Sequence, residues 1–149
     1  MTRKYCTVHP EIWITKPFRK LGPDCKLLAI YLRTCPQFQM VGIFNIAVEI
    51  MAKDTGLTIP TIEDCLQKLE TIDYLKFDSE ADVVWVIDMA VSQVSRGTLS
   101  ERQSKGVINE LTRLYEDDLP FVHDWIGRYG SRYGVTLDDL DFTTGWETK

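Results

Sequence analysis

The sequence has no long apolar segment. Nowhere among its 149 residues does an apolar run approach the roughly 18 residues that span a bilayer. The first ten residues, MTRKYCTVHP, also lack the apolar core of a signal peptide. We therefore expect a cytoplasmic protein without a membrane partner. With 44% hydrophobic and 26% charged residues, the chain has the composition of a globular domain, with or without an appendage.

Signatures of enzymes and of cofactor-binding proteins are also missing. The sequence contains neither G-x-x-x-x-G-K-[ST] nor G-x-G-x-x-G, and it has no nucleophile elbow. Its two histidines, His9 and His123, are too few for a convincing triad or metal site. The four cysteines have no C-x-x-C spacing, so we expect free thiols. The sequence thus predicts no enzyme, no cofactor and no metal.

Charge is distributed unevenly along the chain. Residues 1–35 hold seven basic and two acidic residues, a net charge of +5, whereas residues 36–90 hold three basic and ten acidic residues, a net charge of -7. The remainder, with seven basic and ten acidic residues, brings the total to -5. Such asymmetry concerns the choice of partner more than the fold.

The segment GPDCKLLAIYLRTC, residues 22–35, has the pattern of a helix. Pro23 suits its first turn, and Leu27, Leu28, Tyr31 and Leu32 recur on one face. The short apolar run MVGIFNI, residues 40–46, then predicts a strand.

Two further helices follow, joined by a tight turn. Asn45 is a candidate cap for a helix that ends near residue 55, with Ile50 and Met51 facing inward. Gly56 supplies the left-handed stop, and Thr58 caps the next helix. The apolar stripe of that helix has spacings of three and four: Ile59, Ile62, Cys65, Leu66, Leu69 and Ile72. This is the pattern of a helix-turn-helix.

A hairpin and a second helical region complete the prediction. Runs at residues 74–77 and 83–87 flank the polar stretch DSEAD, which gives the element order of a winged helix over residues 1–90. Residues 91–99 are expected to be a linker. In residues 100–149, Ser100 and Gln103 form a capping box, and a second amphipathic helix ends at Gly130. We expect a mostly α protein with a small antiparallel sheet, a winged helix-turn-helix followed by a C-terminal helical hairpin and a short tail with Trp146.

Several motifs in residues 9–89 resemble one protein family. They are the H-x-x-x-W start, L-x-P-D-x-K-L-L-x-x-Y-L, M-x-G-I-F, A-x-D-T-G-L and V-V-W-V. Together they resemble the N-terminal winged-helix domain of phage and prophage replication proteins of the replication-initiator or replisome-organiser type. The resemblance implies sequence-specific binding at a phage origin and recruitment of host replication proteins.

The third helix and the wing are the elements that would contact duplex DNA. In the usual docking the helix meets base edges and the wing meets phosphates. Thr61, Gln67 and Lys68 suit such contacts, and Glu63 or Asp64 could accept from a cytosine amino group. The expected wing tip has three carboxylates and no cation; these are Asp78, Glu80 and Asp82. An acidic tip would repel a phosphate backbone.

Cations lie on the flanks instead. Two groups are candidates for phosphate contact: Lys16, Arg19, Lys20 and Lys26 around the start of the first long helix, and Arg96, Arg102 and Lys105 after the wing. Ordinary surface charge explains the same residues. The repeat RYGSRYG, residues 128–134, could stack on single-stranded nucleic acid, or it could be a helix end with two glycines.

Two hypotheses of function remain. In the first, the protein is a phage-type replication or regulatory factor that binds double-stranded DNA, and a homodimer would supply a second half-site. In the second, the winged helix is a protein-interaction module, an adaptor or inhibitor, whose acidic residues Glu63, Asp64, Asp78, Glu80 and Asp82 bind a basic host protein.

Overall fold

The structure, a computed structural model, describes residues 5–93 and 100–140. The chain divides into two compact units, Met1–Gln93 and Val94–Lys149. The segment expected to be a linker begins inside a helix, α5 (Met89–Gln93), while residues 94–99 and Trp146 lie outside the described residues. Across residues 5–93 and 100–140, no helix has the length and apolarity needed to cross a membrane.

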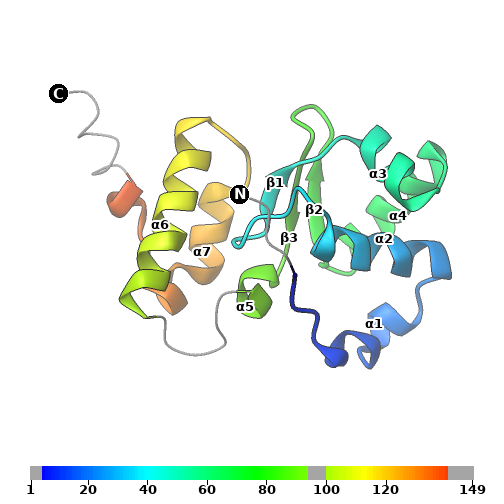
Figure 1. The fold of residues 1–149 in the computed structure, drawn as a ribbon, viewed down its shortest axis with the longest axis horizontal. Coiled ribbons are helices and arrows are strands. Elements are labelled where there is room, and N and C mark those ends of the chain that lie inside the picture. The colour runs from blue at the N-terminus through cyan, green and yellow to red at the C-terminus, as the bar shows by residue number, and fades with distance from the viewer. Residues whose placement is uncertain (1–4, 94–99, 141–149) are drawn as a thin grey trace. The chain divides into compact units, whose positions relative to one another are not determined.

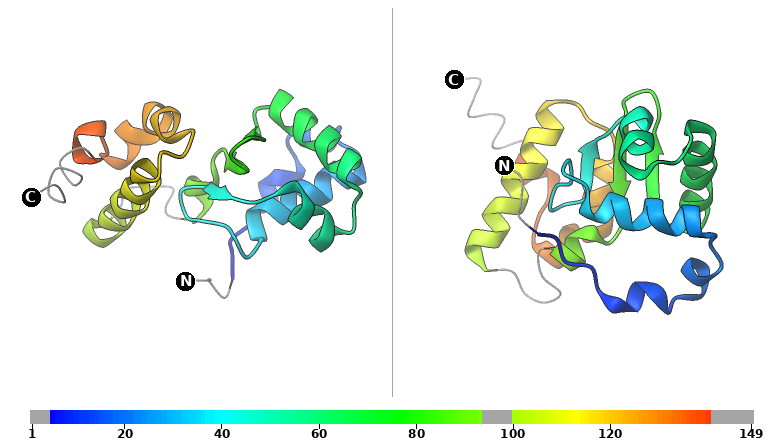
Figure 2. Two further views of the ribbon diagram at one scale, coloured as in Figure 1. Left: turned by 90° about the horizontal axis from the view of Figure 1, so that it is seen from above. Right: turned by 45° about the vertical axis from the view of Figure 1, so that its right-hand side comes forward.

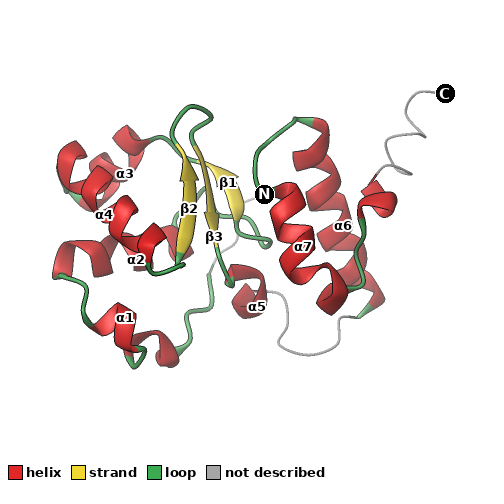
Figure 3. Cartoon of the chain, turned by 180° about the vertical axis from the view of Figure 1, so that it is seen from behind, coloured by secondary structure: helices red, strands yellow, loops and turns green. Residues whose placement is uncertain are grey.

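The first unit has the winged-helix order that the sequence predicts. A 3-10 helix η1 (Pro10–Trp13) and a short helix α1 (Lys16–Arg19) precede α2 (Pro23–Thr34), β1 (Ile43–Asn45), α3 (Val48–Thr55), α4 (Ile59–Thr71), β2 (Leu75–Asp78) and β3 (Val83–Val86). α2, α3 and α4 lie together on one side of the sheet (Figures 1 and 3). The turn between β2 and β3 forms the wing loop at the end of the sheet (Figure 2, right).

The sheet is antiparallel with the strand order β1-β3-β2. Phe44 pairs with Val84, which pairs with Phe77, and these side chains belong to the core shared with the helices. Because side chains alternate along a strand, Trp85 and its partner Ile43 lie on the opposite face. All four residues of β3, the central strand, are buried.

The helices pack around fully buried apolar side chains that include Leu28, Leu32, Met51, Ile62 and Leu69. Four of these five follow the predicted stripes, and Met51 was expected to face inward. The predicted apolar faces were too wide, however, because three residues expected to face inward are exposed. The exposed residues are Leu27 (46%), Ile50 (37%) and Ile59 (41%). The first two stand about 100° round the helix from buried Leu28 and Met51, and Ile59 begins α4 ahead of its first buried turn.

Asn45 does not cap α3, contrary to the sequence-based prediction. It is the last residue of β1, and its side-chain amide donates to the Ala81 carbonyl (3.3 Å). The chain stays extended for one more residue because the Ile46 N–H donates to the Asp82 carbonyl (2.8 Å). The N-cap is therefore Ala47, which provides no side-chain cap.

The second unit contains the predicted helical hairpin. α6 (Glu101–Glu116) and α7 (Val122–Tyr133) lie side by side and run in opposite directions (Figures 1 and 3). The capping box of Ser100 and Gln103 is present, with N to Oγ and N to Oε1 distances of 3.2 and 3.0 Å.

α7 continues past Gly130, where the sequence predicted its end. Tyr129 and Tyr133 are buried beside Trp125, with ring centroids 5.4 and 5.8 Å away, so burial of Tyr133 favours one more helical turn. Gly134, at φ 66°, closes the helix instead. Because both tyrosines of the RYGSRYG repeat are 5% exposed or less, they cannot stack on bases, and that interpretation of the repeat is wrong.

Candidate nucleic-acid interface

The turn between α3 and α4 is fixed by local hydrogen bonds. Gly56 follows α3 at φ 82°, a left-handed conformation that strains other residues. Thr55 Oγ1 donates to the Met51 carbonyl (2.7 Å) and accepts from the Leu57 N–H (3.2 Å). Thr58 then caps α4 by accepting from the Thr61 N–H (3.3 Å). The sequence predicted both ends of this turn, and they orient α4 rigidly against α3.

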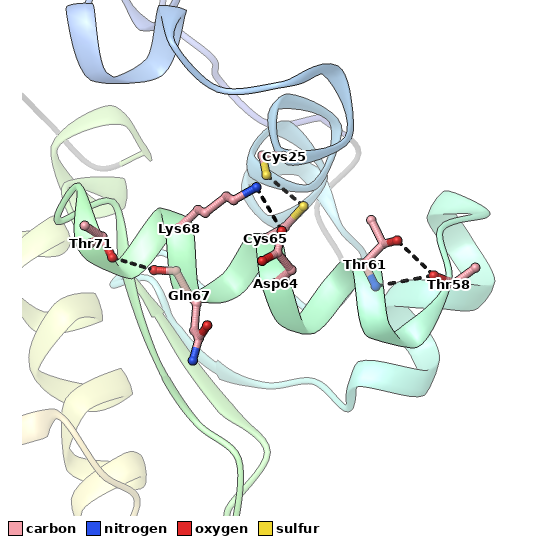
Figure 4. A network of polar contacts seen from close by, with 8 residues as sticks. All are labelled: Cys25, Thr58, Thr61, Asp64, Cys65, Gln67, Lys68 and Thr71. Carbon is pink, nitrogen blue, oxygen red and sulfur yellow. Dashed lines mark hydrogen bonds and ion pairs between the residues drawn. The ribbon is translucent and has the colours of Figure 1, made fainter.

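α4 carries the three residues expected to contact bases. They differ in how exposed they are and in whether other side chains already bind them. Thr61 is half-buried, and its Oγ1 accepts a hydrogen bond from Thr58 Oγ1 (2.9 Å). Lys68 Nζ lies 2.9 Å from Asp64 Oδ2. The Gln67 amide extends from the opposite side of the helix, away from Lys68 (Figure 4), and within the described part of the chain it makes no side-chain hydrogen bond. Gln67 is therefore the group most ready to contact a base edge.

Lys68 is held by Asp64 but is not buried. Both side chains are 58% exposed, and an exposed ion pair one helical turn apart contributes little to stability. The hydrogen bond to Asp64, and then its charge, raise the pKa of Lys68 above its ordinary value. A phosphate could attract Lys68 away from Asp64, but the carboxylate would remain beside it.

Carboxylates dominate the rest of the outer face of α4. Glu63, Asp64 and Glu70 are exposed, and Lys68 is the single cation on the helix. We call these three residues the α4 carboxylates. In a duplex, phosphates follow at roughly one charge per 1.7 Å of axis, so this face would be repelled at long range.

The wing tip is acidic and rigid. Asp78 Oδ1 accepts from the N–H groups of Glu80 and Ala81, both at 3.0 Å, which fixes the turn. Asp82 adopts φ 53°, and its carbonyl accepts from Ile46. The wing carboxylates, Asp78, Glu80 and Asp82, therefore stand on an ordered loop that contains no lysine or arginine. This loop suits a cationic partner better than a phosphate.

The opposite charge gathers on α1. Phe18 is 2% exposed and anchors α1 in the core, which leaves Lys16, Arg19 and Lys20 exposed around it. Lys26, in the first turn of α2, is half-buried. Among the described residues, none of these four side chains has a carboxylate within ion-pair distance. We call Lys16, Arg19 and Lys20 the basic edge.

The remaining predicted cations lie in the second unit. Arg102 and Lys105 are exposed on α6, and Arg96 falls outside the described residues. Within the first unit the predicted residues thus form three sets, on α4, at the wing loop and on α1, with Lys26 apart from them on α2.

Some polar contacts had no clear signal in the sequence. Arg33, counted above among the basic residues, is 9% exposed, and its Nε donates to the Tyr74 hydroxyl (2.8 Å). That hydroxyl donates to the Ala29 carbonyl (2.8 Å), and burial raises the pKa of Tyr74. Arg33 therefore joins α2 to the strand region and is not a surface cation.

Two thiols meet where α2 crosses α4. Cys25 Sγ and Cys65 Sγ are 2.8 Å apart and both cysteines are buried and free (Figure 4). Burial, the contact with Cys25 and nearby carboxylates raise the pKa of Cys65 to about 12, so its thiol is protonated and unreactive at neutral pH. No cluster of three metal-ligating side chains occurs in residues 5–93 and 100–140.

Comparison with known proteins gives no relative. No family model, no curated protein and no solved structure matches this chain.

Proposed function

We propose that this protein is a DNA-binding replication or regulatory factor of the phage type, and that its winged-helix unit binds duplex DNA. The observation that carries the proposal is the combination of an exposed α4, fixed by a capped helix-turn-helix, with an exposed basic edge on the same unit that has no carboxylate within ion-pair distance among the described residues. A cytoplasmic location, a homodimer and contact with host replication proteins belong to the same proposal.

Base contacts and phosphate contacts would come from different elements. Gln67, with Thr61 and Lys68, would meet base edges, because an amide can bond an adenine in two places. Lys16, Arg19, Lys20 and Lys26 would hold phosphates, with Arg96, Arg102 and Lys105 as further cations. If three phosphates are contacted, the affinity should fall roughly fortyfold between 50 and 200 mM salt, because log affinity changes by about 0.9 per contact per decade of salt.

A second function is favoured by the acidic residues on α4 and the wing. Six exposed or half-exposed carboxylates, with Lys68 already paired to Asp64, suit a cationic protein surface. In this alternative the winged unit is an adaptor or inhibitor that binds a basic host protein through Glu63, Asp64 and the wing carboxylates.

One titration separates the two functions. The full chain is added to a fluorescent duplex of random sequence, and anisotropy is followed from about 50 to 200 mM salt. Binding that weakens with salt, and weakens further in R19E/K20E, supports the DNA-binding proposal. If no binding occurs at 50 mM salt, duplex binding is excluded and the proposed function fails. A pulled-down host protein that is lost from E63Q/D64N would then support the adaptor.

A further inference from the structure

Trp13 is an exposed aromatic residue in a cationic setting. It ends η1 and is 52% exposed, and Ile14 beside it is 62% exposed. The other described tryptophans, Trp85 and Trp125, are at most 1% exposed. A large exposed indole is costly to leave in water and is a common binding anchor.

The indole is held in place. The Phe18 ring meets it edge-on, with centroids 5.4 Å apart and planes at 83°. Arg19 Nε donates to the Trp13 carbonyl (3.1 Å), and Thr15 Oγ1 donates to the Ile12 carbonyl (3.4 Å). Phe18 is itself buried, so the segment is tied to the core and presents Trp13 with little loss of conformational entropy on binding.

The charges beside Trp13 are mostly positive. Within the seven residues that follow it are Lys16, Arg19 and Lys20, and no acidic residue lies among them. The hydrogen bond from Arg19 Nε to the Trp13 carbonyl holds one of these cations against the backbone of Trp13. An aromatic ring flanked by cations matches a polyanion whose flat bases are accessible.

We propose that Trp13 and the basic edge bind a single nucleic-acid strand, with one base stacked on the indole and phosphates held by Lys16, Arg19 and Lys20. An intact duplex keeps its bases stacked on one another, so it offers the cations a backbone but offers Trp13 no free base. The site therefore distinguishes an unpaired strand from a duplex, and it does so whether or not α4 binds DNA.

A lipid surface fits the same residues less well. α1 has four residues and one buried aromatic, so it has no apolar face long enough to lie in a bilayer interface. The test below includes vesicle binding for this reason. A protein partner would need a matching acidic surface.

The experiment compares oligothymidylate of roughly twelve nucleotides with a duplex, using anisotropy and the full chain. Stacking contributes enough that W13A should lower the affinity for oligothymidylate roughly tenfold, and W13F by less, while the duplex affinity changes less than twofold. I50A, which removes an exposed apolar side chain from α3, is the matched control and should have no effect. The proposal is overturned if W13A binds oligothymidylate like the unsubstituted protein, or if both affinities fall equally.

Photocross-linking provides a second readout that does not depend on a variant folding. An oligonucleotide with 5-bromodeoxyuridine should cross-link to the peptide that contains Trp13, and cross-linking to other peptides alone would contradict the proposal. Binding to anionic phosphatidylserine vesicles that needs Trp13, without binding to oligothymidylate, would also overturn it. Loss of duplex binding alone, with oligothymidylate binding retained, would refute the proposed function and leave this inference intact.

Discussion

The winged unit has two exposed surfaces of interest. One has the shape expected of a DNA-binding surface, and the other has the charge expected of one. α4 and the wing have the geometry that winged helices use to bind a DNA groove, with a capped helix. Their exposed charges, the α4 carboxylates and the wing carboxylates, are negative. The basic edge has the charge of a phosphate binder but lies on α1, a helix of four residues. Since a fold alone does not determine a ligand, the charge of each surface has to be tested apart from its shape.

Reversing the basic edge should have the largest effect. K16E/R19E/K20E would remove the three proposed phosphate contacts, so duplex affinity should fall on the order of a hundredfold near 0.1 M salt. The slope of log affinity against log salt should become shallower by about three, because each contact contributes about 0.9. An anisotropy titration over a salt series measures both quantities.

The matched control keeps the charges. K16R/R19K/K20R should stay within a few-fold of the unsubstituted protein, since phosphate attraction depends mainly on charge. An unchanged salt slope in the reversed variant would show that the basic edge does not meet the duplex.

Neutralising the α4 carboxylates should act in the opposite direction. E63Q/D64N/E70Q removes three like charges from the surface that faces phosphates in the proposed docking, so the duplex affinity should rise by roughly tenfold. The substitution of Asp64 also frees Lys68 from its 2.9 Å ion pair. Anisotropy at fixed salt gives the affinity, and a pull-down from host extract reports on the alternative function.

The control for this variant changes the net charge equally in the second unit. D117N/D124N/D138N removes three exposed carboxylates, and it should raise duplex affinity much less than the α4 variant. Equal gains from both variants would mean that net charge matters and the surface of α4 does not.

The sequence predicted the fold well where the signals were local. Gly56 and Thr58 mark the helix-turn-helix because left-handed backbone and N-caps demand particular residue types. The apolar spacing of α4 identified Ile62 and Leu69 as core. The prediction that Asn45 caps α3 was wrong because its side chain takes part in a nonlocal contact with Ala81, beside the paired strands.

The candidate sites were harder to predict because their chemistry depends on tertiary contacts. Arg33 contributes only to the charge count in the sequence, and its burial and its hydrogen bond to a tyrosine 41 residues away depend on the fold. The exposure of Trp13 also has no sequence signal, since an indole at that position suits a core equally well. The grouping of cations on α1 was visible in the sequence, but only the burial of Phe18 explains why they face outward.

Weakening the N-cap of α4 tests whether the cap stabilises the helix, and it leaves the charge of the surface unchanged. T58A removes the hydroxyl that accepts from the Thr61 N–H, which should cost about 1 kcal/mol. For a domain of this size the melting temperature of the winged unit should fall by roughly 4–8 °C. Calorimetry measures the shift, and T58S, which keeps the hydroxyl, should melt close to the unsubstituted protein. If T58A melts like T58S, the cap does not stabilise α4.

The smallest effect concerns the contact between α2 and α3. The Tyr31 hydroxyl donates to Asp54 Oδ2 (2.6 Å), so Y31F should lower the free energy of unfolding by roughly 0.5–1 kcal/mol at neutral pH. Burial, and then this hydrogen bond, raises the pKa of Tyr31 above its ordinary value of 10.0. The contribution of Tyr31 to the free energy of unfolding is therefore complete below pH 10. It is lost as the pH rises above 10, because the Tyr31 hydroxyl ionises in the unfolded chain before it does so in the folded protein. Urea unfolding of both proteins from pH 7 to 11 measures the difference between them. The difference should shrink above pH 10, and a constant difference would show that the hydroxyl does not stabilise the helix pair through its proton.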